Sequence, residues 1–365
     1  MKNKTVLFYL NHPAHFHLFS NAISQLSNDG YQIVIVSVAK DVLDDLLKSQ
    51  GWAYTNIFPE GRRDGNKSIW HNTIVGYFKT LFRLIKVVRK AKPGLLIGTE
   101  GTLAHVGFLL GVASFLFNED DTKATPENYL FYPFATKIVL PNCCDAGQWK
   151  GKRISYDGYH ELAYLHPQNF FPDFNVVQKF IPDAGRYFIL RLAQLTASHD
   201  AGKTGITDAI AGEIIDRLEK HGKVFISSER PLSERLEKYR LNLPAQEILH
   251  ALYYADLYIG DSQTMAAEAA VMGTPSIRFN DFVGKLGYLN ELERQYELTF
   301  GIATTEPEKL YAKIEELVNT PNLKSHYANK RKIMLVEQIN TSSFFIDVIK
   351  ERLPLEIEQQ PVCMK

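Results

Sequence analysis

The chain has 365 residues, of which 45% are hydrophobic and 22% charged, and its 41 basic and 41 acidic side chains give a formal net charge of zero. This balance excludes wholesale disorder, and the net charge gives no reason to expect a nucleic-acid partner. The length predicts two domains, and three cysteines without disulfide or metal-binding spacing predict a reduced, cytoplasmic setting.

The first half of the chain alternates apolar runs with segments of helical spacing. We predict strands at 5–10, 31–39, 52–58, 94–101, 114–121 and 136–141, and helices at 16–30, 41–51, 69–90 and 102–111. Near-continuous apolar strands joined by helices are typical of a parallel sheet that is covered on both faces. No apolar run is long enough to predict a membrane-spanning helix.

The pattern weakens between about 145 and 185, which we interpret as an inter-domain connection, and then resumes. It predicts strands at 186–193, 223–229, 256–261 and 275–279, and helices at 206–222, 232–239, 247–255 and 326–350, besides a helix that ends at Gly273. The prediction is an α/β protein of two Rossmann-like parallel-sheet domains that face each other across a cleft. The domains are predicted at 1–175, on the acceptor side, and at 176–350, for nucleotide-sugar binding, followed by a tail at 351–365. Ligands of such sheets bind at the carboxyl ends of the strands.

The run GDSQTMAAEAAVMGTPSIRF, residues 260–279, follows a predicted strand and holds one acidic residue in an alanine-rich helix. Asp261 or Ser262 can cap this helix, and the free N–H groups of its first turn suit a phosphate. The carboxylate of Glu268 can accept hydrogen bonds from two adjacent hydroxyls, as on a ribose. The alternative is that Glu268 is a solvated helix residue and the alanines pack on the sheet.

This run resembles the nucleotide-binding helix of UDP-N-acetylglucosamine 2-epimerases and related GT-B glycosyltransferases. Those proteins have an Asp-Ser turn, then a Glu, then Gly-x-Pro, and Asp261, Ser262, Glu268, Gly273 and Pro275 match without a gap. The resemblance implies that Asp261, Ser262, Gln263 and Thr264 form the donor site around the diphosphate and that Glu268 holds the ribose.

The whole chain is similar to the DUF354 proteins of bacterial and archaeal surface-polysaccharide clusters. The similarity lies at HPAHFHLFSNAISQL, at ILRLAQLTASHDAG and at 260–279, and it spans about residues 3 to 350. It implies a fold of the GT-B type.

The segment NHPAHFHLF, residues 11–19, places three histidines after the first strand. Imidazole suits acid–base work near neutral pH, so we expect His15 or His12 to act on the substrate. The alternative is that one or two of these histidines cap the helix or pack in the core. The segment is similar in position to the Gly-rich loop of the transferase that adds N-acetylglucosamine to the lipid-linked peptidoglycan precursor, where His15 matches best, although Asn11, His12 and Pro13 replace the glycines.

Two further strand ends carry candidate residues. Glu100 follows the fourth strand, at a position similar to an acidic residue of the 2-epimerases, and is a candidate catalytic group. Glu119, Asp120 and Asp121 follow the fifth strand, where the epimerases carry a His-x-Glu-Ala-Gly-Leu-Arg run that this chain lacks. We interpret this acidic trio as a solvated loop.

The loop RLAQLTASHDAGKTGI, residues 191–206, opens the second domain. In GT-B proteins the equivalent loop faces the donor phosphates, so the resemblance implies donor contacts for Arg191, His199 and Lys203. The alternative is a plain surface loop.

The helix at 77–92 is basic and amphipathic, a pattern found in helices that lie on an anionic membrane. The alternative, which we favour, is an ordinary helix that covers the sheet and has a charged outer face.

We therefore expect a glycosyltransferase that takes a sugar from a nucleotide-diphosphate donor, UDP-linked, and passes it to a glycan or lipid-linked acceptor in surface-polysaccharide synthesis. No metal, cofactor or nucleic acid is expected, and the setting is cytoplasmic, with peripheral inner-membrane contact through 77–92 as an option. The alternatives are a sugar-nucleotide 2-epimerase, which is an isomerase, and a non-catalytic sugar-nucleotide-binding protein.

Overall fold

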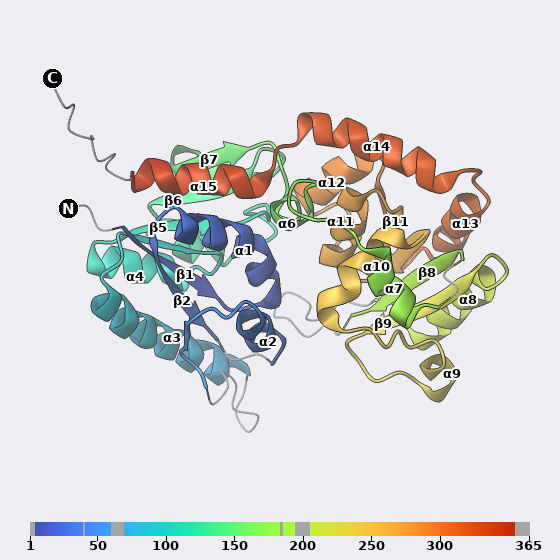
Figure 1. Cartoon of the computed structure of the whole chain (residues 1–365), viewed down its shortest axis with the longest axis horizontal. Coiled ribbons are helices and arrows are strands. Elements are labelled where there is room, and N and C mark those ends of the chain that lie inside the picture. Colours follow the sequence, from blue (N-terminus) through green and yellow to red (C-terminus); the bar gives the residue numbers. More distant parts are fainter. Residues whose placement is uncertain (1–3, 39–40, 60–68, 183–184, 194–204, 355–365) are drawn as a thin grey trace, which may run out of the picture.

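The computed structural model describes residues 4–38, 41–59, 69–182, 185–193 and 205–354. These residues form two parallel sheets, of seven and five strands, which lie side by side with helices around each (Figure 1). The predicted α/β fold with two parallel sheets is confirmed. The central strands of both sheets are buried because they consist almost wholly of apolar residues, whereas the edge strands Tyr54–Asn56 and Arg153–Tyr156 are partly exposed.

The first sheet has the order β3-β2-β1-β4-β5-β6-β7. Its strands are β1 (Thr5–Leu10), β2 (Gln32–Ser37), β3 (Tyr54–Asn56), β4 (Leu95–Gly98), β5 (Ala113–Phe117), β6 (Lys137–Pro141) and β7 (Arg153–Tyr156). Its connecting elements are α1 (Pro13–Asn28), α2 (Asp41–Ser49), α3 (Ile69–Ala91), α4 (Thr102–Leu110), α5 (Asn128–Phe131) and η1 (Gly147–Lys152). The helix α1 contacts α2, whereas α3 contacts α4, so two groups of helices cover the sheet.

The second sheet has the order β12-β11-β10-β8-β9. Its strands are β8 (Tyr187–Leu192), β9 (Lys223–Ser228), β10 (Leu257–Gly260), β11 (Ser276–Phe279) and β12 (Thr299–Ile302). The helices of this part are α8 (Asp208–Leu218), α9 (Glu234–Glu237), η3 (Ala245–Glu247), α10 (Ile248–Tyr254), α11 (Gln263–Met272), α12 (Gly287–Arg294), α13 (Pro307–Val318) and α14 (Leu323–Glu337).

The segment that we interpreted as a connection, 145–185, is more structured than predicted. It contains β7, which pairs with β6 as a further strand of the first sheet, and the short helices α6 (Leu162–Leu165) and α7 (Phe174–Phe180). The strand β7 is only four residues long and half-exposed, so its apolar signal in the sequence is weak.

The predicted last helix, 326–350, is two helices in the structure. The helix α14 ends before Gln338, whose backbone is extended, and α15 (Thr341–Arg352) begins after Asn340, whose side chain caps the new helix. The helix α15 returns to the first sheet and packs against α1 and α6 (Figure 1). Three elements between 287 and 318, namely α12, β12 and α13, were not predicted.

Candidate functional site

In each sheet the order of the strands reverses beside a predicted site segment. The first sheet reverses between β1 and β4, which are followed by Asn11 and by Thr99, and the second between β8 and β10, which are followed by Ala193 and by Asp261. The chain leaves such neighbouring strands in opposite directions, which opens a crevice at their carboxyl ends where ligands of α/β proteins bind. The sheet topology therefore points to the same residues as the sequence.

The edge of the first sheet joins two of the candidate catalytic residues in one hydrogen-bond network. The His15 Nε2 atom lies 2.8 Å from the hydroxyl of Thr99, and the Asn11 N–H donates to His15 Nδ1 over 3.4 Å. The side-chain amide of Asn11 also donates to Glu100, which accepts a further bond of 3.3 Å from the hydroxyl of Thr102. His15 and Glu100 are thus held together across the strand reversal, as the positions of the strand ends require.

The other two histidines of this segment have different surroundings. His12 is exposed and accepts a 3.2 Å hydrogen bond from the Ala14 N–H, so it caps α1. His17 packs against the ring of Tyr164 with a centroid distance of 5.3 Å, and burial lowers its pKa to about 4. His17 is therefore neutral at physiological pH and serves the packing of α1 on α6.

Asp261 holds together the second strand reversal. Its carboxylate accepts hydrogen bonds from the N–H groups of Ala193, at 2.7 Å, and Ile206, at 3.1 Å, and Asp261 is 4% exposed. It thereby ties β8 and the start of the α8 region to the end of β10. The cap of α11 is Ser262 instead, whose hydroxyl accepts from the Met265 N–H at 3.4 Å. Of the two residues that could cap this helix, the second does so.

The first turn of α11 has backbone N–H groups that the described residues leave unbonded. No described residue accepts a hydrogen bond from the N–H of Gln263 or Thr264, and the buried Oε1 atom of Gln263 has no partner among the described residues. These N–H groups lie at the positive end of the helix dipole, where an anion is stabilised. The side chain of Thr264 is exposed.

Glu268 is a buried carboxylate at the junction of the two halves of the molecule. Its Oε1 atom accepts a 2.7 Å hydrogen bond from the hydroxyl of Tyr164 on α6, and the residue is 7% exposed. Burial raises its pKa to about 7, although the Tyr164 bond and the charge of Arg191 both oppose that shift. The alternative of a solvated glutamate is therefore wrong. The alanines of α11 do pack in the core, as that alternative held.

Arg191 ends β8 close to Glu268. Its guanidinium donates to the Ser227 hydroxyl over 2.7 Å and to the carboxylate of Glu229, whereas its buried Nε has no described partner. Ser227 and Glu229, at the end of β9, thus hold the positive charge of Arg191 at the second strand reversal. His199 and Lys203, the other predicted donor contacts of this loop, lie outside the described residues.

The acidic trio is not a solvated loop, contrary to our interpretation. Glu119 accepts a hydrogen bond of 3.3 Å from the His160 N–H, and burial together with the nearby Glu161 and Asp120 carboxylates raises its pKa well above the usual value. Glu161 is 1% exposed, one of its oxygens has no described partner, and burial raises its pKa to about 8. The sequence places these carboxylates in different segments, and only packing brings them together.

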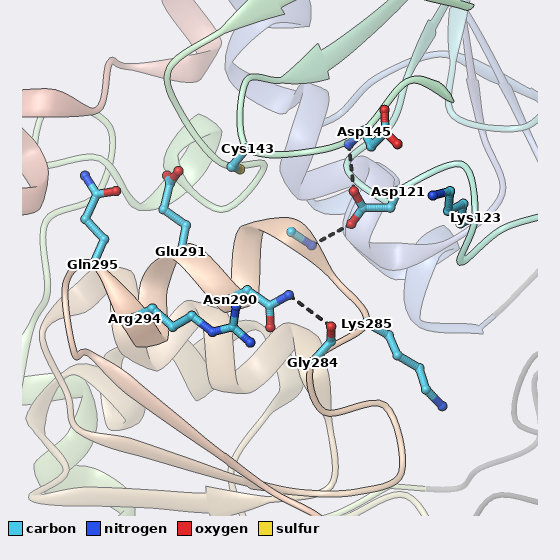
Figure 2. A pocket seen from close by; sticks show the side chains of 11 residues that line it. Asp121, Lys123, Cys143, Asp145, Gly284, Lys285, Asn290, Glu291, Arg294 and Gln295 are labelled. Atoms are coloured by element: carbon cyan, nitrogen blue, oxygen red, sulfur yellow. Dashed lines mark hydrogen bonds between the residues drawn. The ribbon is translucent and has the colours of Figure 1, made fainter. Parts of the chain in front are cut away.

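Asp121 joins the two halves of the molecule through backbone groups. Its carboxylate accepts hydrogen bonds of 2.6 Å from the N–H of Asp145 and from the N–H of Gly287, the first residue of α12. Figure 2 shows these bonds at the edge of a cavity of about 590 Å³, whose walls come from both halves. Its lining includes Asp121, Lys123, Glu291 and Arg294 but none of the described residues that we predicted to be catalytic or to bind the donor. We give more weight to the strand reversals, because that is where the candidate side chains meet.

One family model covers almost the whole chain. The family model described as "Protein of unknown function (DUF354)" matches residues 5–351. The chain belongs to the DUF354 family. A related sequence, "Uncharacterized protein MJ0665" of Methanocaldococcus jannaschii, is 25% identical over 307 residues, which cover 80% of this chain and 87% of that protein.

Solved structures with this fold include two kinds of enzyme. The UDP-GlcNAc 2-epimerase of Neisseria meningitidis bound to UDP-GlcNAc has a TM-score of 0.66 at 13% identity, covering 95% of this chain and 100% of that one. The "Glycotransferase of kitacinnamycin" has a TM-score of 0.63 at 10% identity, covering 96% and 99%. The DUF354 chain therefore has a GT-B-like fold, as predicted.

The described residues of this DUF354 protein contain neither a helix that could span a membrane nor a cluster of side chains that could hold a metal ion. No helix in the described ranges is both long enough and apolar enough to cross a bilayer. No group of three or more His, Cys, Asp or Glu side chains among the described residues is arranged to hold a metal ion.

Sequence reasoning missed Tyr164, Thr99 and Glu161 as partners of the candidate residues. Tyr164 and Glu161 lie in the run HELAYL, which has no strand or motif signal. The only signal that could have identified this run is its cluster of Tyr, His and Glu, within a segment whose hydrophobic periodicity is weak.

Proposed function

We propose that this protein binds a nucleotide-diphosphate sugar, UDP-linked, between its two sheets and transfers the sugar to a glycan or lipid-linked acceptor. The observation that carries the proposal is the buried Glu268 carboxylate, one turn beyond the first turn of α11, whose N–H groups have no described partner. This pair of features fits the two polar ends of a nucleoside diphosphate, a ribose with two hydroxyls and an anionic diphosphate.

In the proposed complex the diphosphate lies at the N–H groups of Gln263 and Thr264. Arg191, whose Nε has no described partner, contributes the countercharge. The leaving nucleotide gains negative charge as the glycosidic bond breaks, and a fixed helix N-terminus and guanidinium stabilise that charge without reorganisation. Ser262 contributes by capping the helix, and Asp261 by holding the neighbouring backbone in place.

The ribose is proposed to bind at Glu268. Its Oε1 atom already accepts from Tyr164, and no described residue donates to Oε2, so a ribose hydroxyl can donate to the second oxygen. The ionised carboxylate is the better acceptor, and a pKa of about 7 means that both protonation states are populated at neutral pH. Nucleotide binding is therefore expected to strengthen as the pH rises through 7 and the carboxylate ionises.

The acceptor side is proposed to be the edge that carries His15 and Glu100. A general base must lie within hydrogen-bond reach of the acceptor hydroxyl, and the Nε2 atom of His15, now 2.8 Å from Thr99, occupies such an edge position. Glu100 is bonded to Asn11, which also contacts His15, so we assign it a positioning role.

A 2-epimerase is the second candidate, and the buried carboxylates favour it. Epimerisation at C2 by elimination and re-addition of the nucleotide needs both an acid and a base near the sugar. Glu161, with a pKa of about 8, stays protonated at neutral pH and can serve as the acid. Glu161 in turn lies near enough to Glu119 to raise the pKa of that carboxyl.

A thermal-shift screen against UDP, GDP, CMP and their sugar conjugates tests nucleotide binding. A ligand at about 100 times its Kd adds about 2.7 kcal/mol of stability. We expect a shift with UDP compounds that is lost in Glu268→Gln and retained in Glu308→Gln, a matched change at an exposed helix position. No shift with any nucleotide would contradict both enzyme assignments.

Product analysis then separates the candidates. Release of UDP that depends on an acceptor supports transfer, whereas a changed sugar on an intact nucleotide without acceptor supports epimerisation. Nucleotide binding without any turnover, unchanged in His15→Ala, would identify a binding protein instead.

A further inference from the structure

The exposed large hydrophobic side chains of this protein are concentrated on one part of the first sheet's cover. Of thirteen such side chains among the described residues, eight lie on or beside three neighbouring elements. They are Ile74, Phe78 and Phe82 of α3, Phe108 and Leu109 of α4, and Tyr129, Leu130 and Phe134 in and around α5. We call this set the apolar face. Most are more than half exposed, among them Phe82 at 61% and Phe108 at 65%.

The apolar face is continuous because His105 joins its three segments. The hydroxyl of Tyr77 on α3 is hydrogen-bonded to Nδ1 of the His105 ring on α4, and Nε2 of the same ring donates to the Leu130 carbonyl over 3.1 Å. The His105 ring also lies 4.6 Å from the ring of Phe134, which in turn lies 5.1 Å from the ring of Phe108. The face is thus a fixed surface, built on packed rings.

Helix α3 combines this face with positive charge. Ile74, Phe78 and Phe82 recur every four residues and form one stripe, while Leu81, Leu84 and Val88 are buried toward the sheet. Lys79 and Lys86 are exposed and lie three and four residues from Phe82, so they are its neighbours on the helix surface. Arg89 and Lys90 are also exposed, and neither α3 nor α4 contains an Asp or Glu.

We propose that the apolar face and the basic side of α3 dock this protein on the surface of an anionic phospholipid bilayer. A soluble monomer seldom exposes so many clustered aromatic and aliphatic side chains without a partner. Lysine and arginine beside an apolar stripe match the two layers of a membrane surface, its anionic headgroups and its acyl chains. A second protein copy would place like charges of α3 against each other, so the charge pattern favours lipid.

The apolar face borders the candidate acceptor edge. Gly101 follows Glu100, and a side chain added at Gly101 would lie 2.0 Å from the ring of Phe131 in α5. Docking would therefore bring the Glu100 edge near the bilayer, where a lipid-linked acceptor resides. The docking itself is independent of nucleotide binding, whereas its use for an acceptor rests on the proposed function.

Pelleting of the full chain with vesicles, without nucleotide, tests the docking. Vesicles of phosphatidylcholine alone are compared with vesicles that also contain phosphatidylglycerol. We expect about tenfold more protein bound to the anionic vesicles, and a steep loss when salt rises from about 0.05 to about 0.5 M. Binding to neither kind of vesicle would overturn the proposal.

Paired variants separate the apolar and the electrostatic parts. Phe78→Ser with Phe82→Ser, and Lys79→Glu with Lys86→Glu, should each reduce binding to anionic vesicles by roughly tenfold. The matched controls are Ile333→Ser with Val336→Ser, exposed on α14, and Lys220→Glu with Lys332→Glu, exposed near the second sheet. Equal binding by the test and control pairs would overturn the proposal.

Folding and self-association are measured on the same samples. An unchanged midpoint of thermal unfolding shows that each variant is folded, and Phe108→Ser with Leu109→Ser provides a second apolar pair if the first fails to fold. A wild-type dimer that Phe78→Ser with Phe82→Ser dissociates would identify the apolar face as an interface between copies and overturn the lipid assignment. The nucleotide thermal shift, measured in solution, reports separately on the proposed function.

Discussion

The hydroxyl of Tyr164 donates a 2.7 Å hydrogen bond to the buried carboxylate of Glu268. The two residues are 104 positions apart, and they belong to α6, which packs on the first sheet's helix α1, and to α11, which packs on the second sheet. The ring of Tyr164 also contacts His17 of α1. One tyrosine therefore couples the predicted ribose-binding residue to the histidine segment of the other sheet.

Loss of the Tyr164 hydroxyl should destabilise the protein. Tyr164→Phe keeps the ring and its packing but leaves a buried carboxylate without its donor, which costs about 1–3 kcal/mol of unfolding free energy. Urea denaturation measures this loss. The control is Tyr239→Phe, which removes a 2.8 Å bond to the exposed Glu219 and should change stability by no more than about 0.5 kcal/mol. If Tyr164→Phe and Tyr239→Phe lowered the unfolding free energy equally, burial of the Tyr164–Glu268 hydrogen bond would make no difference to its contribution to stability.

The raised pKa of Glu268 predicts a pH-dependent difference between the wild type and Glu268→Gln. Between the usual value of 4.5 and the folded value of about 7, the folded protein binds a proton that the unfolded chain releases. The unfolding free energy of the wild type therefore falls, relative to that of Glu268→Gln, as the pH rises through this window, and the difference then stays constant.

The full change corresponds to about 3 kcal/mol for a group buried this deeply. Urea denaturation of both proteins at pH values from 5 to 8 measures it. The same stability difference at both ends of this range would contradict the assignment of a raised pKa to Glu268.

The two candidate histidines should differ in what their loss affects. His12→Ala removes the cap of α1 and should cost about 1 kcal/mol of stability, with less than about tenfold loss of turnover. His15→Ala should lower turnover by about 10²- to 10⁴-fold while the nucleotide thermal shift remains, because His15 lies in α1 beside the first sheet, whereas α11 lies beside the second. The opposite pattern, with His12 essential and His15 dispensable, would reverse these roles.

Gly287 marks a close approach of the two halves of the molecule. A side chain there would lie 2.2 Å from the carbonyl oxygen of Cys143, so Gly287→Ala must move backbone and strain the 2.6 Å bond to Asp121. We expect a loss of about 1–3 kcal/mol and a larger radius of gyration in solution scattering. Gly151→Ala, with no atom within 4 Å of the added group, is the control. If Gly287→Ala had the radius of gyration and the stability of the wild type, the contact between the two halves at Gly287 would be able to adjust to a side chain.

Much of the fold was predictable because its strands are buried on both faces. Such strands are continuous apolar runs, and β1, β4, β8 and β10 were predicted for that reason. The strand β7 was missed because it is short and half-exposed, and β12 because it is only four residues long, so their periodicity is weak. The helices α12 and α13 do carry helical spacing, with Leu310, Ile314 and Leu317 on one face of α13, so the sequence could have predicted them. The break between α14 and α15 depends on Gln338 and Asn340, which carry no helix-breaking signal as strong as Pro or Gly.

By itself the sequence determined the local features, because these depend on neighbouring residues. The end of the first strand before Asn11, a helix cap at Asp261 or Ser262 and the end of α11 at Gly273 all follow from apolar runs and capping chemistry. Tertiary structure alone decided that Asp261 holds the backbone of Ala193 and Ile206, that Glu119 is not solvated, and that Glu268 is buried under Tyr164. Those contacts join residues tens of positions apart in the sequence. The pKa values of the Glu119 and Glu268 carboxyls depend on desolvation, which exists only once the two halves of the molecule have packed.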